Sequence, residues 1–263
     1  MILAIILLSI IAVCGFYFLS NKHKKKVNIR ASGTVYKSLL TQQIPFYQAL
    51  DNSSKILFEQ KIADFLLGIT IEGVGTVVED IDRVMIASSA VIPIFGFKDW
   101  KYRNLTNVIL YPDTFDSEFQ FEGENRSILG MVGTGYMNGQ MILSRAALIK
   151  GFSRSAGKEN TAIHEFVHLL DKSDGATDGI PVNLLAHNYV IPWLKMIHQE
   201  IHQIEEGKSD INPYAITNEA EFFAVAAEYF FQKPDELKHK HPELYAMLST
   251  MFMQDRAGGV SSS

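Results

Sequence analysis

Residues 161–171 read TAIHEFVHLLD, and this stretch decides the fold. Its apolar residues recur at helical spacing, at Ile163, Phe166, Val167 and Leu170. A helix formed here can therefore pack one face into a core. On the same helix His164 and His168 stand one turn apart, so their side chains share a face. The stretch predicts a packed helix that presents two imidazoles on one side.

Two histidines at this spacing can reach one zinc ion with bonds of about 2.0–2.1 Å. Glu165 lies beside that metal and cannot easily bind the same ion. It can instead take a proton from a zinc-bound water and later deliver one to a leaving amine. The HExxH pattern therefore predicts a zinc peptidase in which His164 and His168 bind the metal and Glu165 is the general base. Ordinary helix histidines bonded to carbonyls are the alternative.

A catalytic zinc usually has three protein ligands and one open position, so a third ligand is required. Residues 217–231 read TNEAEFFAVAAEYFF, a strongly helical segment in which Asn218 is the expected N-cap. The segment offers three candidate carboxylates, Glu219, Glu221 and Glu228. Glu221 is our choice, but it also has the capping-box spacing from Asn218, in which it would bond the Asn218 amide instead. Spacing alone leaves all three glutamates open.

His198 and His202 form a second pair one turn apart. No glutamate follows the first of these histidines, and their neighbours Glu200, Glu205 and Glu206 are typical of an exposed helix. A solvated helix face is therefore favoured over a second metal pair.

The rest of the chain mixes helical and strand patterns. Residues 46–67 predict two helices, residues 79–92 predict another, and residues 108–111 predict a short buried strand. Residues 131–136 and 140–144 flank Asn138 and Gly139, which readily form a tight hairpin turn. We therefore expect an α+β domain at residues 44–255, with a β-hairpin before the HExxH helix.

The N-terminal residues 2–19 are apolar and uncharged, close to the ~20 residues that a membrane-spanning helix needs. Basic residues follow directly, at Lys22, Lys24, Lys25 and Lys26. Because positive residues favour the cytoplasmic side, we expect an N-terminal transmembrane helix with the catalytic domain in the cytoplasm. This predicts a transmembrane anchor at residues 1–20, a basic juxtamembrane linker at 21–43 and a disordered tail at 256–263. A lipoprotein signal at Cys14 and a cleaved signal peptide are the alternatives, and both lack a basic start.

Composition excludes some classes of partner. The net charge is -5 with both signs interspersed, so the basic face that a nucleic-acid binder needs is missing. The single cysteine, Cys14, excludes an intrachain disulfide. The expected partners are a peptide or protein substrate and, through the N-terminal helix, a membrane.

Several segments, in this order, resemble the Mlc titration factor A family of zinc-dependent peptidases and, more distantly, the catalytic domain of anthrax lethal factor. These segments are VILYPDTF at 108–115, MILSRAALIKG at 141–151, HEFVHLLDKSDGATDGIP at 164–181 and PYAITNEAEFFAVAAEYFF at 213–231. The resemblance implies a zincin-like, gluzincin-like metallopeptidase domain with one zinc ion per chain and possible aminopeptidase-type activity. It also implies that Glu221 is the third ligand.

The same resemblance implies roles for two more residues. Tyr214 falls where lethal factor has a tyrosine credited with stabilising the transition state, and a simple packed tyrosine is the alternative. Asp171 matches an aspartate that can hold the second nitrogen of a ligand histidine, and capping of the helix end is the alternative.

The resemblance also implies a second kind of function, because the family's namesake binds the glucose-responsive repressor Mlc. The alternative to a peptidase is therefore a membrane-tethered regulatory module that binds zinc structurally and sequesters a cytosolic transcriptional repressor. Glu165 discriminates the two, since binding alone has no need of a general base beside the metal.

Overall fold

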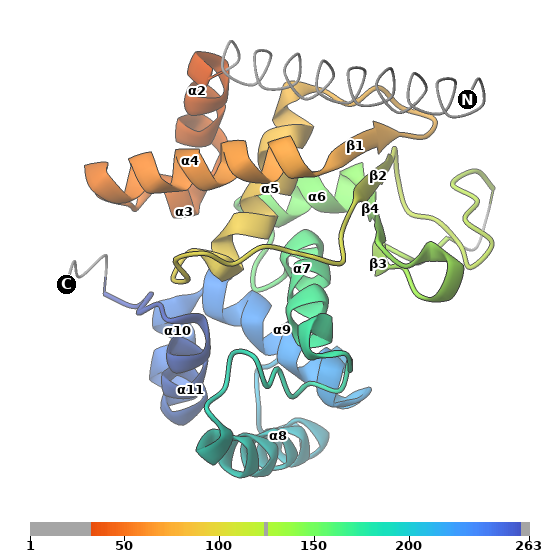
Figure 1. Ribbon diagram of the computed structural model, residues 1–263. Helices are drawn as coiled ribbons and strands as arrows, with labels where there is room; N and C mark the ends of the chain where they lie inside the picture. The colour runs from red at the N-terminus through yellow and green to blue at the C-terminus, as the bar shows by residue number, and fades with distance from the viewer. Residues whose placement is uncertain (1–32, 124–125, 259–263) are drawn as a thin grey trace, which may run out of the picture.

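The computed structural model describes residues 33–123 and 126–258, in which a small mixed sheet lies at one side of a group of helices (Figure 1). The architecture confirms the expected mixture of α and β structure. The α-helices are α2 (Gly33–Gln43), α3 (Pro45–Gln48), α4 (Asn52–Gly68), α5 (Asp80–Ile94), α6 (Arg145–Phe152), α7 (Thr161–Asp171), α8 (Val190–Glu205), α9 (Glu219–Gln232), α10 (Pro234–Lys240) and α11 (Pro242–Phe252). The strands are β1 (Thr70–Gly73), β2 (Asn107–Tyr111), β3 (Gly130–Val132) and β4 (Gln140–Ser144). Short 3₁₀ helices are η1 (Gly135–Met137), η2 (Lys172–Asp174), η3 (His187–Tyr189) and η4 (Pro213–Ile216).

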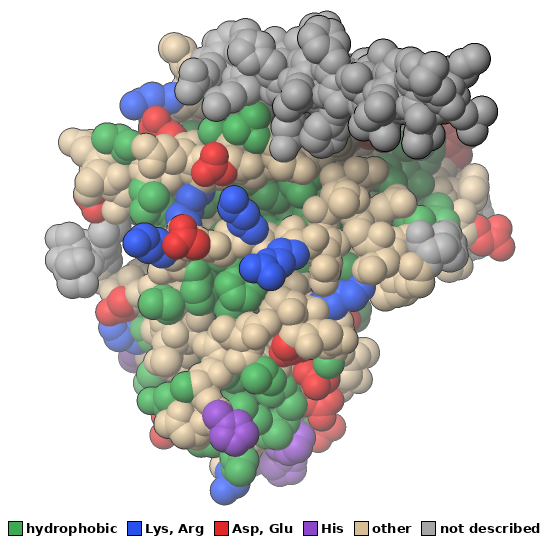
Figure 2. All heavy atoms as spheres, viewed as in Figure 1, with side chains coloured by type: hydrophobic (Ala, Val, Ile, Leu, Met, Phe, Trp, Pro, Cys, Tyr) green, Lys and Arg blue, Asp and Glu red, His purple; other side chains and the backbone are tan. Residues whose placement is uncertain are grey.

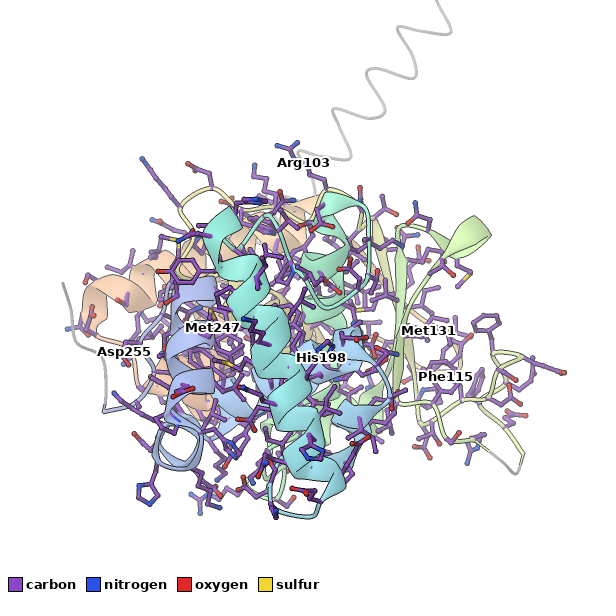
Figure 3. The ribbon with its side chains drawn as sticks, turned by 90° about the horizontal axis from the view of Figure 1, so that it is seen from below. Arg103, Phe115, Met131, His198, Met247 and Asp255 are labelled. Atoms are coloured by element: carbon purple, nitrogen blue, oxygen red, sulfur yellow. The ribbon has the colours of Figure 1, made fainter. Side chains whose placement is uncertain are left out.

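The strands form one sheet in the order β1-β2-β4-β3. β1, β2 and β4 run parallel, and β3 pairs antiparallel with β4 in the register Met131↔Ile142. β3 is therefore an edge strand. Met131 packs with Phe115 in a small separate apolar cluster, on the side away from the helices in Figure 3. The other face of β3 is turned to α7, because a Cβ placed on Gly130 would lie 2.8 Å from the Cγ of Glu165.

The expected hairpin before the HExxH helix is present, but the prediction of a tight turn at Asn138 and Gly139 is wrong. The first strand ends at Val132, and η1 lies in the connection to β4. Only Gly139 of the pair has a positive φ, at 89°, whereas Asn138 has a φ of -56°. A two-residue hairpin turn of the expected type needs positive φ at both positions, so the chain makes a longer connection.

The core lies between α5, α7 and α9, which are buried along most of their length. α9 contributes Phe222, Phe223 and Phe230, all 0% exposed, and Trp193 of α8 packs against the first two. α7 is thereby held between the sheet and α9. This burial places the two histidines of α7 in a closely packed part of the protein.

The folded part of the chain begins earlier than expected. Residues 33–43, which lie in the expected linker, form α2, and Tyr36 and Leu40 on this helix are buried in the main core. The expected anchor at 1–20, the linker residues up to 32 and the tail residues 259–263 lie outside the described residues. Among the helices of residues 33–123 and 126–258, none is long and apolar enough to cross a membrane.

The expected elements between residues 46 and 111 are present with small shifts. α3 and α4 are the two helices that the pattern at 46–67 predicts, and β2 contains the expected strand. α5 continues to Ile94, so Pro93 lies inside its last turn and does not end the helix.

A charged network fixes the segment that leads into η4. The carboxylate of Asp210 accepts hydrogen bonds from Lys240 Nζ (2.6 Å) and Tyr229 Oη (3.0 Å), and it pairs with Lys158. Its other oxygen lies 2.8 Å from Nε2 of His241. Burial alone would raise the pKa of Asp210, but these donors outweigh it and hold the pKa well below its ordinary value.

A depressed pKa predicts how this network contributes to stability. Asp210 stabilises the fold while it is ionised, so its contribution is full above the ordinary value of 3.8 and declines as pH falls below it. We expect Asp210→Asn to lower the free energy of unfolding by about 1–2 kcal/mol at neutral pH. Urea unfolding should show the difference from wild type shrinking at about pH 3. A difference that stays constant over this range would contradict the assignment.

Candidate metal centre

α7 carries the two histidines that the sequence singles out. The side chain of Asn160 caps the helix by accepting a hydrogen bond from the backbone N–H of Ile163 (3.1 Å). His164 and His168 then lie one turn apart, and their ring centroids are 4.7 Å from each other. The local sequence thus fixes both the start of the helix and the face that bears the imidazoles.

α9 supplies the carboxylate that faces these histidines. Asn218 is its N-cap, as expected, and accepts a hydrogen bond from the backbone N–H of Glu221 (2.9 Å). The side chain of Glu221 does not return to Asn218 but reaches across to α7. Only half of a capping box is therefore formed, and the carboxylate is free for another role.

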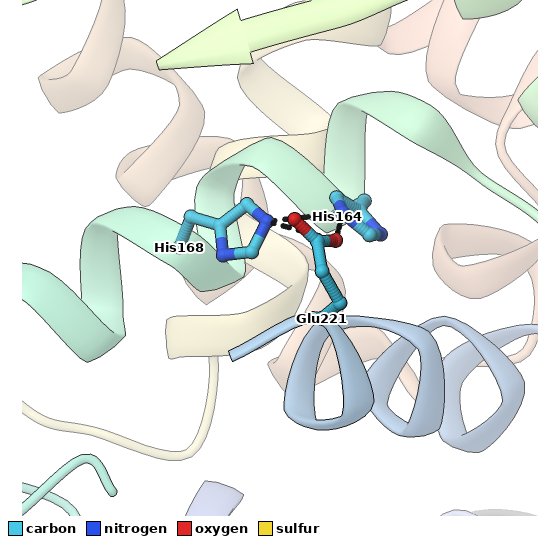
Figure 4. Close-up of side chains that lie close together, drawn as sticks. All are labelled: His164, His168 and Glu221. Carbon is cyan, nitrogen blue, oxygen red and sulfur yellow. Dashed lines mark hydrogen bonds and ion pairs between the residues drawn. The ribbon is translucent and has the colours of Figure 1, made fainter. Parts of the chain in front are cut away.

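The three side chains converge on one point (Figure 4). Nε2 of His164 lies 3.0 Å from Nε2 of His168 and 2.9 Å from Oε2 of Glu221, and His168 Nε2 lies 3.5 Å from the same oxygen. Their ligand atoms all lie within 4.8 Å of one another. Within residues 33–123 and 126–258, His164, His168 and Glu221 form the group of histidine and acidic side chains that can hold a metal ion.

The charges of these groups are strongly coupled. Burial opposes a charged ring at His164, but hydrogen bonds to Glu221 and Glu228 outweigh it and raise its pKa to about 10. Burial likewise opposes the charge on Glu221, yet the two histidines lower its pKa to about 2. A positive charge is therefore favoured where Glu221 meets the imidazoles, and a metal cation can supply it in place of a proton.

Glu165 lies next to this group in a closely packed position. It is 7% exposed, and burial raises its pKa while the charges of His164 and His168 act in the opposite direction. Gly130 of β3 packs directly against it, since an added Cβ would lie 2.9 Å from Glu165 Oε1. A side chain at position 130 would therefore displace the carboxylate. Glycine here explains how β3 can approach α7 so closely.

Tyr214 stands on η4, at the opposite wall. Its backbone N–H donates to the side chain of Asn212 (3.0 Å), which fixes the turn, and its ring centroid lies 6.1 Å from that of His164. Tyr214 as a whole residue is 55% exposed, and it lines the pocket that contains His164 and Glu165. Burial and the charges of Glu221 and Glu165 raise its pKa, so the phenol keeps its proton and can donate a hydrogen bond.

A cleft extends to both sides of the histidines. One part, of about 580 Å³, is lined by Met131, Val132, Lys172, Asp178 and Glu219. The other part, of about 530 Å³, is lined by Ile128, Leu129, Glu159, Asn212 and Val225. Gly130, His164, Glu165 and Tyr214 line both parts. An extended chain can therefore pass over the candidate metal centre.

Asp171 makes no hydrogen bond to His164 or His168, although its Oδ1 and the Nδ1 of His168 are both buried without a hydrogen-bond partner. One of its oxygens accepts a hydrogen bond from the backbone N–H of Gly179 (2.8 Å), and burial raises its pKa to about 6. Trp193 holds the same glycine by donating to its carbonyl (2.7 Å). Gly179 packs against the first turn of α9, because an added Cβ would lie 2.2 Å from the carbonyl oxygen of Glu219. Asp171 thus fixes the loop that supports α9, a role that neither sequence interpretation anticipates.

The other candidates from the sequence occupy different places. Glu219 lines the cleft and pairs with His198 (3.5 Å) without joining the three converging side chains. Histidine side chains reach the surface over α8 (Figure 2), and those of His198 and His202 are each 65% exposed. Figure 3 places His198 on that helix. Glu228 faces His164 from the side opposite Glu221 and is buried, with an Oε2–Nδ1 distance of 3.0 Å.

The comparison with known proteins agrees with the candidate metal centre formed by His164, His168 and Glu221. A family model described as the glucose-regulated metallo-peptidase M90 matches residues 19–253. The chain belongs to this family. An M90 metallo-peptidase is expected to hold a metal ion, and His164, His168 and Glu221 are placed to do so.

Individual relatives of this M90 chain support the same assignment. An uncharacterised protein of Synechocystis is 30% identical over 255 residues, which cover 92% of both chains. Mlc titration factor A of Pectobacterium atrosepticum is 29% identical over 192 residues, covering 67% of this chain and 69% of the relative. That of Serratia proteamaculans is 31% identical over 164 residues, covering 56% and 60%. The expected kinship with the Mlc titration factor A family is confirmed.

Proposed function

We propose that this protein is a zinc-dependent metallopeptidase of the zincin type. The observation that carries the proposal is the convergence of His164, His168 and Glu221 beside a buried glutamate. With bonds of about 2.0–2.1 Å, two tetrahedral zinc ligands lie roughly 3.3–3.4 Å apart. The distances of 2.9, 3.0 and 3.5 Å between the three donor atoms need only small adjustments to match. Three protein ligands also leave the open position that a catalytic site requires.

The residues around the donors have the roles that peptide hydrolysis demands. A zinc ion held by His164, His168 and Glu221 would lower the pKa of a water molecule and polarise a carbonyl group. Glu165 accepts the proton of the attacking water and returns one to the leaving amine. Burial raises the pKa of Glu165, and the charges of His164 and His168 oppose this rise. Tyr214 donates a hydrogen bond to the oxygen that becomes negatively charged.

The edge of β3 provides the means to hold a peptide. Ser144 N–H donates to Leu129 and Gly133 N–H donates to Gln140, each at 2.9 Å, so these positions bond to β4. Successive residues of an antiparallel strand point their backbone N–H and C=O groups to opposite sides. Those of Gly130 and Val132 therefore point away from β4 and face the cleft. An extended substrate can bond there as an added strand, with its scissile carbonyl beside Glu165.

The test of this proposal is metal removal and replacement. The purified protein should contain one zinc ion per chain and cleave members of a fluorogenic peptide panel. Chelation should abolish cleavage, and one equivalent of zinc should restore it. Bound zinc without cleavage of any peptide, before or after chelation, would contradict the peptidase assignment.

Tyr214 gives a narrower prediction. Tyr214→Phe removes the phenolic donor while keeping the ring, so we expect kcat to fall about 10²-fold with little change in KM. Steady-state kinetics on one cleaved peptide measure this. Tyr189→Phe is the matched control, because Tyr189 lies on η3 and lines neither part of the cleft. An unchanged kcat in the Tyr214 variant would remove this residue from the mechanism.

A regulatory function is the second candidate, favoured by the name of two relatives, Mlc titration factor A. In this case the domain binds a transcriptional repressor and its metal is structural. Capture of a repressor should then survive Glu165→Gln with the metal retained. The two functions are separable, because cleavage depends on the general base and capture does not.

For localisation, we propose that residues 1–20 anchor the domain to a membrane with the catalytic part in the cytoplasm. The support is the uncharged apolar run at 2–19 followed by lysines. Proteolysis of intact cells should leave the folded domain undigested. Digestion of the folded domain by protease added outside the cells would show that the domain faces the outside and would contradict the proposed orientation.

A further inference from the structure

Glu228 bridges the start of α7 and the ligand histidine. This residue lies on α9, two helical turns beyond Glu221, and is only 7% exposed. Its Oε1 accepts a hydrogen bond from the backbone N–H of Asn160 (2.6 Å), the N-cap of α7. Its Oε2 lies 3.0 Å from Nδ1 of His164. One carboxylate therefore contacts both the helix cap and the imidazole.

The contact at Nδ1 determines which nitrogen of His164 can bind a metal. A carboxylate accepts hydrogen bonds, so the imidazole must carry its proton on Nδ1. A metal cation held by Nε2 would replace the proton that Glu221 otherwise accepts there, leaving a neutral imidazole with its single N–H on Nδ1 and its lone pair on Nε2. Nε2 is the atom that meets His168 and Glu221, at 3.0 and 2.9 Å. Glu228 thus selects the tautomer that the donor group needs.

We propose that Glu228 is a positioning residue that sets the tautomer and orientation of His164 for metal binding. The proposal rests on the zinc site described above. The two carboxylates of α9 then have different roles. Glu221 binds the metal directly, and Glu228 acts through the second nitrogen of His164. Such outer contacts typically change metal affinity by ~10- to 100-fold.

Glu228→Gln tests the proposal because neither orientation of the amide satisfies both neighbours. If the amide oxygen accepts from Asn160, the NH₂ group faces Nδ1 and forces the proton onto Nε2, where it blocks the metal. If the amide oxygen faces His164, the NH₂ group opposes the N–H of Asn160 as donor against donor. The substitution keeps the size of the side chain and changes only its hydrogen bonding.

The experiment measures zinc affinity of the wild-type chain and Glu228→Gln by competition with a chromophoric chelator. We expect the dissociation constant to rise ~10- to 100-fold in the variant. Cobalt(II) substituted for zinc should also show a changed absorption spectrum, since the spectrum reports ligand geometry and a merely structural role would not alter it. Glu243→Gln is the control, because Glu243 is an exposed residue of α11 that lines neither part of the cleft, and the zinc affinity and cobalt spectrum of this variant should match those of wild type.

Equal zinc affinity and an identical cobalt spectrum in a folded Glu228→Gln variant would overturn the proposal. If that variant does not fold, nitrogen NMR of ¹⁵N-histidine in the zinc-loaded wild-type chain decides instead. The proposal expects a protonated Nδ1 and a metal-bound Nε2 at His164, and the opposite pattern would overturn it. A wild-type chain that binds no zinc would overturn the proposed function itself, and this inference with it.

Discussion

Replacing Glu165 by glutamine is expected to lower peptide cleavage by about 10²–10⁴-fold while the bound zinc is retained. Glutamine has the same size, so it fits the packed space against Gly130, but it cannot accept the proton of the attacking water. Because Glu165 is not one of the three converging donors, metal content should not change. The rate of cleavage of a fluorogenic peptide and the zinc content, measured on the same preparations, test this.

The matched control for this variant is Glu243→Gln, which removes an exposed carboxylate of α11 that lines neither part of the cleft. Its cleavage rate should stay near that of wild type. Cleavage that survives in Glu165→Gln would show that another group activates water, and the mechanism proposed above would be wrong.

Replacing Glu221 by alanine is expected to remove both the metal and the stability that the metal confers. A ligand present at 1,000 times its dissociation constant stabilises the folded state by about 4 kcal/mol. For a chain of this size, 1 kcal/mol corresponds to roughly 2–4 °C in melting temperature. Excess zinc should therefore raise the melting temperature of wild type by about 10 °C and leave that of Glu221→Ala unchanged.

Thermal denaturation with and without zinc measures the effect. Glu219→Ala is the control, since Glu219 lies in the same first turn of α9 and pairs with His198 instead of the two ligand histidines. The control should keep the full zinc-dependent shift. If both variants lost the zinc-dependent rise in melting temperature to a similar extent, the first turn of α9 would merely be disrupted and Glu221 would have no specific role.

The parts of the site that the sequence predicts best are those that depend on one helix. His164, Glu165 and His168 belong to a single amphipathic segment, so their relative positions follow from helical spacing alone. The N-cap role of Asn218 is equally local and was readable for the same reason. These predictions needed no knowledge of how the helices pack.

The position of the proposed third ligand depends on packing between α7 and α9, which helical spacing cannot predict. Spacing alone leaves Glu219, Glu221 and Glu228 open; Glu221 is our choice from the sequence, and the family resemblance also implies it. The packing separates them: Glu221 faces both histidines, Glu228 reaches the far nitrogen of His164, and Glu219 turns toward α8. The interval of seven residues between Glu221 and Glu228 was the signal available, because it places both on one face of α9.

Two other differences between the sequence-based expectations and the structure also arise from contacts that lie outside the local segment. Asp171 has the right spacing to reach His168, but its Oδ2 accepts a hydrogen bond from the backbone N–H of Gly179, and its Oδ1 has no hydrogen-bond partner. Asn138 and Gly139 form a favourable tight-turn pair, but η1 precedes them and lengthens the connection between β3 and β4. In both cases a contact from outside the local segment overrides the local preference.

The most direct test of the metal centre is anomalous diffraction from crystals of the zinc-loaded protein, recorded on both sides of the zinc absorption edge. A single strong anomalous peak should lie about 2.0–2.2 Å from Nε2 of His164, Nε2 of His168 and a carboxylate oxygen of Glu221. A peak at His198 and His202, or the lack of any peak in protein that binds zinc in solution, would contradict the account.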